Sequence, residues 1–253
     1  MKITFLGTGT SQGVPIIACG CEVCQSTDSH DKRLRSSVMI ENEGQLFVID
    51  TGPDFREQML RENVKRLDAV IYTHEHRDHL GGLDDIRGFN FVMGRAIDLY
   101  ADENVENAMK KMYPYIFSEI KYPGIPEIVL HRVTGEPFTI GKTKFTPIRV
   151  MHYKLPIWGY RIGGFVYITD ANFIPAEEKK KIKGCDILVL NALRRESHIS
   201  HYTLDEAISV ATELQPKRAY LTHISHQLGK HKDVEKELPP FIRLAYDRLK
   251  LEL

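Results

Sequence analysis

The stretch from Thr73 to His79, Thr-His-Glu-His-Arg-Asp-His, constrains the fold of this chain more than any other feature. It places three imidazoles and a carboxylate within six residues, directly after the apolar run of residues 68–72. That run predicts a buried strand, and residues 80–83 predict the start of a helix. A strand end, a tight turn and a helix start therefore meet at the ligand-type residues, which is where α/β proteins place their chemistry.

The spacing within this stretch indicates metal binding. His74 and His76 are two residues apart, so on an extended segment their side chains point the same way and can hold one ion. Asp78 and His79 lie further round the turn and are free to hold a second ion. Four ligand-type residues at this spacing favour a metal site over a histidine-rich surface loop.

Later predicted strands also end on residues that can bind a metal. These residues are His152, Asp170 and His223. Strands that finish at the same edge of a sheet would bring these side chains to the first motif. Seven nitrogen and oxygen ligands are too many for one closed tetrahedral zinc. They predict two ions that share a carboxylate and keep open positions for water.

A second cluster consists of cysteines. Cys19, Cys21 and Cys24 lie within six residues of each other, and the fourth cysteine is Cys185. In a reducing compartment this spacing indicates metal ligands rather than disulfides. Three thiolates need a fourth ligand to close a zinc tetrahedron, and His226, close behind the last strand-end histidine, is the best candidate. A structural zinc can supply on the order of 10 kcal/mol of folding free energy. Cys185 precedes a buried strand and is assigned to packing.

Length and charge narrow the class of protein. The 253 residues are expected to form one domain, 1–253. Lysine plus arginine equals aspartate plus glutamate, 34 each, which disfavours nucleic acid as a partner. No apolar run is long enough to span a bilayer, and residues 1–6 are too short for a signal peptide. The sequence therefore predicts a cytoplasmic protein with no membrane partner, and it leaves a homodimer open.

Periodicity and turn residues predict the remaining elements. Residues 37–40 and 46–49 read as a hairpin. Helices are expected over 54–63, 79–87, 103–112, 175–182 and 204–214, with Thr203 as the N-cap of the last. Residues 234–248 are expected to be mainly helical, interrupted by Pro239 and Pro240. The loop at 121–126 is a candidate for substrate contacts.

The motif His74-x-His76-x-Asp78-His79, followed by His152, Asp170 and His223, resembles the metallo-β-lactamase superfamily. The resemblance covers essentially the whole chain, including the turns at 7–9 and 50–52. It implies an α/β fold, a four-layered αββα sandwich with the metals at the sheet edges. It also implies an allocation of ligands: His74, His76 and His152 on one metal, Asp78, His79 and His223 on the other, and Asp170 bridging.

The resemblance narrows further to phosphodiesterases. In the branch that includes tRNA 3′-processing endonucleases and PhnP cyclic phosphodiesterases, a histidine before the helix at 204–214 assists the leaving group. The resemblance implies that His201 is a general acid or a charge stabiliser, with His198 as the weaker candidate for this role. Asp78 and His201 are thus the expected catalytic residues. The cysteine cluster with His226 resembles the extra structural zinc of the PhnP-like group.

The sequence thus predicts a dinuclear metal-dependent phosphodiesterase. It is expected to cleave a small or cyclic phosphodiester with a metal-bridging hydroxide, using two divalent ions (manganese or zinc) and one structural zinc. Arg35, Arg87 and Tyr202 are further candidates for holding the substrate phosphate.

Three alternatives stay open at this stage. A tRNA 3′-processing endonuclease usually carries a long Gly/Pro-rich arm, and nothing in this sequence matches that arm. The complete ligand set disfavours a non-catalytic cofactor-pathway protein of the PqqB kind. A thioester hydrolase of the glyoxalase II type shares the seven ligands, but the His201 segment and the cysteine cluster speak against it.

Overall fold

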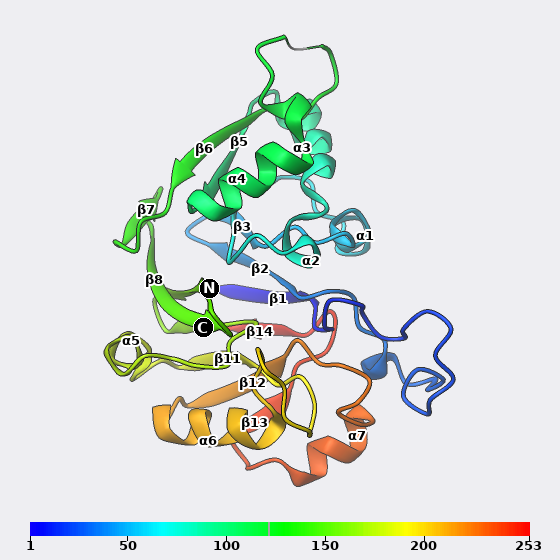
Figure 1. The fold of residues 1–253 in the computed structure, drawn as a ribbon. Coiled ribbons are helices and arrows are strands. Elements are labelled where there is room, and N and C mark those ends of the chain that lie inside the picture. Colours follow the sequence, from blue (N-terminus) through cyan, green and yellow to red (C-terminus); the bar gives the residue numbers. More distant parts are fainter. Residues whose placement is uncertain (121) are drawn as a thin grey trace.

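A computed structural model describes residues 1–120 and 122–253 (Figure 1). Lys121, the first residue of the loop predicted to contact substrate, lies outside the described residues. Two sheets stack face to face, and helices cover the outer face of each, so the chain forms the four-layered sandwich that the sequence predicted.

The two sheets are built in the same way. The first has the order β14-β1-β2-β3-β4-β5-β6 and the second the order β13-β12-β11-β10-β9-β8-β7. In each sheet one half is antiparallel, and the other half, β3 to β6 or β10 to β13, is parallel. The strands of the first sheet are β1 (Lys2–Gly7), β2 (Ser37–Asn42), β3 (Gln45–Ile49), β4 (Ala69–Ile71), β5 (Ile97–Ala101), β6 (Ile128–Arg132) and β14 (Lys250–Glu252). Those of the second are β7 (Phe138–Ile140), β8 (Thr143–His152), β9 (Leu155–Ile162), β10 (Phe165–Tyr167), β11 (Ile187–Asn191), β12 (Arg218–Thr222) and β13 (Ile242–Leu244).

Helices of the first half of the chain cover the first sheet, and helices of the second half cover the second sheet (Figure 1). The first group is α1 (Phe55–Arg61), α2 (Arg77–Leu80), α3 (Arg87–Met93) and α4 (Glu103–Met112). The second is α5 (Ala176–Ile182), α6 (Leu204–Leu214) and α7 (His231–Val234). Short 3-10 turns lie at Ser29–Asp31, Leu83–Ile86, Pro114–Ile116 and Glu235–Glu237.

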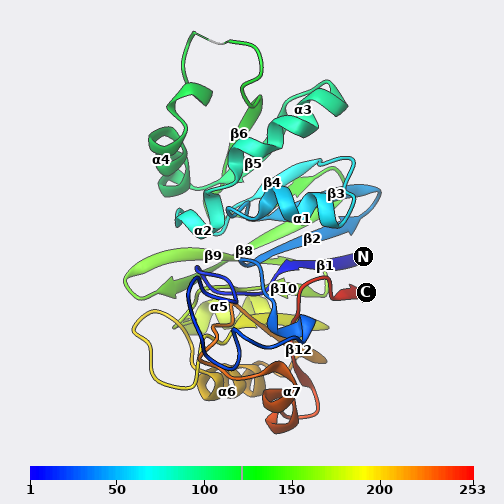
Figure 2. The same cartoon turned by 90° about the vertical axis from the view of Figure 1, so that its right-hand side faces the viewer.

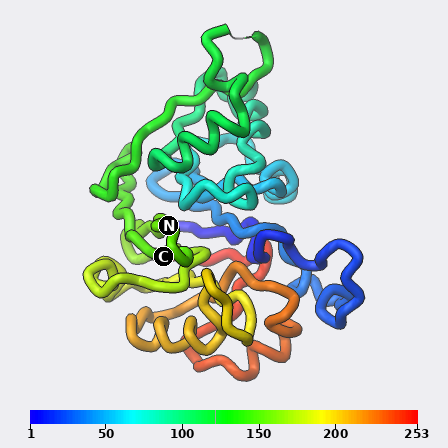
Figure 3. The backbone as a smooth tube through the Cα atoms, viewed as in Figure 1, coloured from blue at the N-terminus to red at the C-terminus, as the bar shows by residue number. Residues whose placement is uncertain are grey.

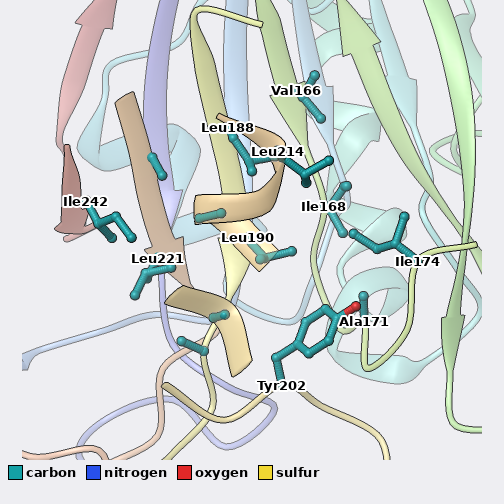
Figure 4. Close-up of a cluster of buried hydrophobic side chains, with 14 of the residues drawn as sticks. Val166, Ile168, Ala171, Ile174, Leu188, Leu190, Tyr202, Leu214, Leu221 and Ile242 are labelled. Carbon is teal, nitrogen blue, oxygen red and sulfur yellow. The ribbon is translucent and has the colours of Figure 1, made fainter. Parts of the chain in front are cut away.

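Alternating side chains divide the core into three apolar layers. In β11, Ile187 and Val189 face the layer between the sheets, whereas Leu188 and Leu190 face the helices. Figure 4 shows the layer beneath α6, where Leu188 and Leu190 meet Leu214. A third layer packs the first sheet against α1, α3 and α4. Because strands buried on both faces must be apolar throughout, they read as continuous hydrophobic runs in the sequence.

Several predicted elements are confirmed and others are corrected. Helix α6 begins after Thr203, its N-cap as the sequence predicted, and the structure adds a capping box between Thr203 and Glu206. In place of the helix expected at 79–87, α2 ends at Leu80, and after Gly81 and Gly82 a 3-10 turn runs directly into α3. The helix expected at 234–248 is wrong: α7 ends at Val234, and Ile242–Leu244 forms β13. The two prolines provide no backbone N–H for a helix, and β13 instead pairs in parallel with β12.

The chain ends lie side by side (Figure 3). β1 and β14 pair in antiparallel fashion at the edge of the first sheet, and the Met1 amino group donates to the Leu253 carbonyl over 2.6 Å. Among the residues that the structure describes, no helix is both long and apolar enough to cross a membrane.

Candidate metal centre

The ligand-type residues predicted from the sequence gather at one edge of the sandwich. They follow β4, β10 and β12 or, in the case of His152, end β8, so both sheets contribute. Figure 2 shows α2, the turn between β8 and β9, and the loop before α6 on the same side of the molecule. Two sets of side chains bring their ligand atoms within 4.8 Å of one another: His74, His76 and His152, and Asp78, His79, Asp170 and His223.

Asp170 lies between the two sets. Its Oδ1 is 3.1 Å from His223 Nδ1 and 3.3 Å from His79 Nε2, while its Oδ2 is 4.0 Å from His74 Nε2. One carboxylate therefore faces histidines of both sets, as a bridging ligand must. His79 Nε2 is also 3.2 Å from Asp78 Oδ2.

Several buried histidine nitrogens of the centre make no hydrogen bond, which fits a bound cation. Within the described part of the chain, His74 Nε2, His79 Nε2 and His223 Nδ1 are buried and have no hydrogen-bond partner. Leaving buried polar atoms unpaired is costly, so such atoms in a native protein call for a ligand. Imidazole nitrogens beside carboxylate oxygens are a donor set that suits zinc and manganese. The residues therefore fit the divalent ions that the sequence predicted.

The pKa values of the buried residues in the centre also fit a bound cation. Burial alone would raise the pKa of Asp170, yet His223 and His79 hold that pKa well below its usual value. Burial, and after it the neighbouring His79, lowers the pKa of His74 well below its usual value. The His74 imidazole therefore stays neutral, as a metal ligand must. Buried ionised carboxylates need positive charge nearby. Burial alone would lower the pKa of His79, yet Asp170 and Asp78 raise it well above its usual value, so a proton on His79 takes the place of the ion when none is bound.

A buried carboxylate behind the ligands was not predicted as a site residue. Asp50, which follows β3, has an oxygen 2.7 Å from His79 Nδ1. It also accepts hydrogen bonds from the backbone N–H and the hydroxyl of Thr73, each over 2.8 Å. A carboxylate bonded to the outer nitrogen of a histidine fixes the ring and its tautomer. The sequence signal was its position, because Asp50 ends a strand like the ligands themselves.

Three of the strand-end residues share an unusual backbone conformation. Asp50, Asp170 and His223 have positive φ angles of 65°, 59° and 55°. Residues with a β-carbon avoid this left-handed region, and strained backbone of this kind gathers at functional sites. The same local turn at the ends of β3, β10 and β12 therefore directs side chains from both sheets toward one centre.

His201 lies beside the metal ligands. Its ring centroid is 4.6 Å from that of His152 and 4.9 Å from that of His223, and its Nδ1 is buried without a partner. Burial lowers the pKa of His201 to about 3. His198 is further out: its ring lies 5.0 Å from His201, and its Nδ1 contacts Ser200. The structure thus places His201 within the cluster and His198 at its rim.

The cysteine cluster meets His226 as the sequence predicted. Cys19 Sγ and Cys21 Sγ lie 3.4 and 3.2 Å from His226 Nδ1. In a zinc tetrahedron the sulfur-to-nitrogen edge is about 3.6 Å, so the four residues are close to ligand geometry. A hydrogen bond from the Cys24 backbone N–H, then one with His226, lowers the pKa of Cys21 to about 6. The donors fit a structural zinc.

Three further candidates for phosphate contacts have other partners. Arg35 forms an ion pair with Asp54 over 2.8 Å, and Arg87 pairs with Asp84 over 3.2 Å. Tyr202 is 6% exposed and packs in the core beneath α6 (Figure 4). Tyr202 is thus a core residue, contrary to that prediction.

Comparison with known proteins places the chain among metallohydrolases. Residues 46–224 match the family described as the β-lactamase superfamily domain. A solved structure described as a new diphosphatase from the PhnP family is 45% identical, with a TM-score of 0.94 over 100% of this chain and 97% of that one. An octanoyltransferase of Porphyromonas gingivalis is 41% identical over 98% of this chain, but the chain spans only 51% of that relative's length. A ribonuclease Z of Treponema denticola is 22% identical over 86% of this chain and 92% of its own.

Proposed function

The chain belongs to the metallo-β-lactamase superfamily, within its PhnP family, and from this membership we propose that it is a metal-dependent phosphodiesterase. It is a hydrolase of the metallo-β-lactamase fold. The proposal goes one step further and names a small or cyclic phosphodiester as the substrate and two divalent ions as the cofactors.

One observation carries the proposal: a single carboxylate, Asp170, faces histidines of two ligand sets at a buried edge. His74, His76 and His152 would hold one ion. Asp78, His79 and His223 would hold the other, and Asp170 would serve both. Two ions at such a site supply a water molecule of lowered pKa and positive charge for the phosphoryl oxygens. A phosphodiester, which is anionic and rich in oxygen, matches that charge.

The residues around the ligands complete the reaction. Hydrolysis joins a water oxygen to phosphorus and breaks the bond to the leaving oxygen, which needs a proton or a hydrogen bond as it departs. His201 would provide that hydrogen from its ring nitrogen. The Asp78 side chain is 14% exposed, against 3% for Asp170, so Asp78 is the carboxylate on the open side. It can orient the attacking water by accepting a hydrogen bond.

The cysteine cluster would hold a separate structural zinc. Cys19, Cys21, Cys24 and His226 bring their ligand atoms within 4.8 Å of each other. Because His226 lies three residues after His223, a zinc there would fix the cysteine loop against the wall of the centre.

Hydrolysis of a diphosphate linkage is the second candidate. It is favoured by the 45% identical structure, which is described as a diphosphatase. The two reactions share the ions and the leaving-group histidine and differ in the leaving group, which is an alcohol in one and a phosphate in the other.

The test is a substrate panel assayed after loading with Mn²⁺ or Zn²⁺, with metal analysis of the same sample. The panel holds bis(p-nitrophenyl) phosphate, alkyl and cyclic phosphodiesters, a nucleoside diphosphate and precursor tRNA. We expect turnover of the small diesters, and a loss of about 10²- to 10⁴-fold with alkyl diesters in His201→Ala. His131→Ala, which removes a surface histidine paired with Asp98, is the matched control. Preferential processing of the precursor tRNA would refute the proposal and favour a tRNA 3′-processing endonuclease instead.

A further inference from the structure

The side-chain amide of Asn172 connects three segments that carry site residues. It lies two residues after Asp170, between β10 and α5. Its Oδ1 accepts a hydrogen bond from the Tyr153 backbone N–H over 2.7 Å, and its Nδ2 donates to the Ile199 carbonyl over 3.1 Å. Its own backbone N–H donates to the Met151 carbonyl over 2.8 Å. One residue is thus bonded to the turn after β8 and to the loop before α6.

Both bonded segments present site residues to the centre. Tyr153 follows His152 and has a positive φ of 57°, a conformation that a tyrosine adopts only when its surroundings hold it there. Ile199 is two residues before His201. Between them, the Ser200 carbonyl lies 2.8 Å from His152 Nδ1. The amide and this histidine contact therefore bind the same short loop from two sides.

The loop depends on such contacts for its shape. Its two ends are joined by a hydrogen bond from the Leu193 N–H to the Tyr202 carbonyl, and the Tyr202 N–H donates to the Ala171 carbonyl of the segment after β10. Residues 195–197 and 199 in its middle are exposed. Without a partner for the Ile199 carbonyl, the segment next to His201 has fewer constraints on its position.

We propose that Asn172 is a positioning residue that acts through His201. The amide holds the loop so that the His201 ring stays beside the centre, while the Tyr153 bond fixes the turn on the other side. This inference rests on the proposed function, in which His201 assists the leaving group. Misplacing a catalytic group by about 1 Å can cost on the order of 10²-fold in rate, so loss of a single amide at this position can lower the rate substantially.

The experiment compares Asn172→Ala, His201→Ala and the double variant in the metal-loaded enzyme. With alkyl diesters we expect Asn172→Ala to lower kcat about 10- to 100-fold at unchanged KM. The double variant is expected to be no slower than His201→Ala alone, because effects that share one route are not additive. Asn90→Ala is the matched control: that amide also ties loops, at Arg95 and Glu127, away from the site.

Two readouts do not depend on activity. Metal content of Asn172→Ala is expected to equal that of the wild type, since Asn172 is not a ligand. Hydrogen exchange at the Tyr153 amide is expected to rise in Asn172→Ala. It is expected to stay slow in Asn172→Asp, which keeps the acceptor for that amide but loses the donor to Ile199. The aspartate variant is nevertheless expected to lose kcat with alkyl diesters.

Several results would overturn the inference. Additive losses in the double variant, a loss of metal in Asn172→Ala, or an equal loss in Asn90→Ala would each exclude action through His201. So would wild-type kcat in Asn172→Ala. These failures differ from failure of the proposed function, in which the wild-type enzyme itself turns over no phosphodiester.

Discussion

Replacing Asp50 by asparagine tests whether the metal centre depends on the carboxylate behind it. The Asp50 side chain is fully buried and bonded to His79 Nδ1, to the Thr73 N–H and to the Thr73 hydroxyl. While the Asp50 carboxylate accepts a hydrogen bond from the His79 Nδ1–H, Nε2 of His79 carries no proton and is free to bind an ion. An amide nitrogen facing Nδ1 would donate instead, which moves the ring proton to Nε2 and blocks the ligand atom.

The size of the effect follows from the role of the bond. Outer partners of metal-binding histidines typically contribute about 10- to 100-fold in metal affinity or activity. That range corresponds to about 1.4–2.7 kcal/mol. Asp50→Asn is nearly isosteric and keeps one acceptor for the Thr73 N–H. We therefore expect the fold to survive and the metal dissociation constant to rise by this factor.

The assay is metal affinity by competition with a chelator, together with kcat on a phosphodiester. Asp98→Asn is the matched control, because Asp98 Oδ1 lies 2.6 Å from His131 Nε2 in a similar pair that is partly exposed, near the start of β5. Wild-type affinity in Asp50→Asn would refute the argument. An equal loss in Asp98→Asn would show that the effect is not local to the centre.

Three further predictions concern residues outside the ligand set of the active-site centre. His226→Ala is expected to remove about one zinc per chain and to expose the cysteine loop to protease; unchanged zinc content on metal analysis would exclude His226 as a ligand. Burial, more than its charged neighbours, lowers the pKa of His231 from 6.5 to about 4. As the pH falls, His231 is therefore protonated in the unfolded chain before it is protonated in the folded one, so the free energy of unfolding decreases between pH 6.5 and about 4. His231→Gln is expected to flatten this acid-side loss in urea unfolding, and an unchanged pH dependence would contradict the assignment. Gly82→Ala would place a Cβ 2.1 Å from the Gly52 carbonyl oxygen and is expected to lower the free energy of unfolding by about 1–3 kcal/mol. Gly88→Ala, in the open on α3, is expected to raise it by about 0.5–1 kcal/mol, so equal effects of the two in thermal unfolding would rule out steric crowding at Gly82.

The sequence predicted what local spacing determines. The ligand types of the stretch at 74–79 and the N-cap at Thr203 each depend on only a few neighbouring residues, so both could be predicted directly. The apolar runs of β3, β4 and β11 also reveal strands buried on both faces. These features need no knowledge of which strand lies beside which.

Pairings between distant segments could not be read in this way. Segment 242–244 lacks a strong local preference and becomes β13 because β12 offers an unpaired parallel edge. Asp50 and Tyr153, the residue whose N–H bonds to Asn172, have positive φ angles that their residue types do not predict. The contacts of Asp50 and Asn172 depend on these turns. Asp50 contacts a histidine 29 positions away, and Asn172 contacts a carbonyl 27 positions away. A side chain that supports a ligand is therefore harder to find than the ligand.

The construction of the two sheets explains why the centre lies where it does. Most of the ligands and their support follow strands of the parallel half of each sheet: Asp50 and His74 come after β3 and β4, Asp170 and His223 after β10 and β12. His152, at the end of β8, comes from the antiparallel half of the second sheet. Parallel strands end at a common edge, so each sheet delivers its ligands to one side. Face-to-face packing then places Asp170 of the second sheet within 3.3 Å of His79 of the first. An ion bound there stabilises only the packed state, by about 2.7 kcal/mol when its concentration is 100 times the dissociation constant. The free energy of metal binding is therefore also free energy that holds the two sheets together.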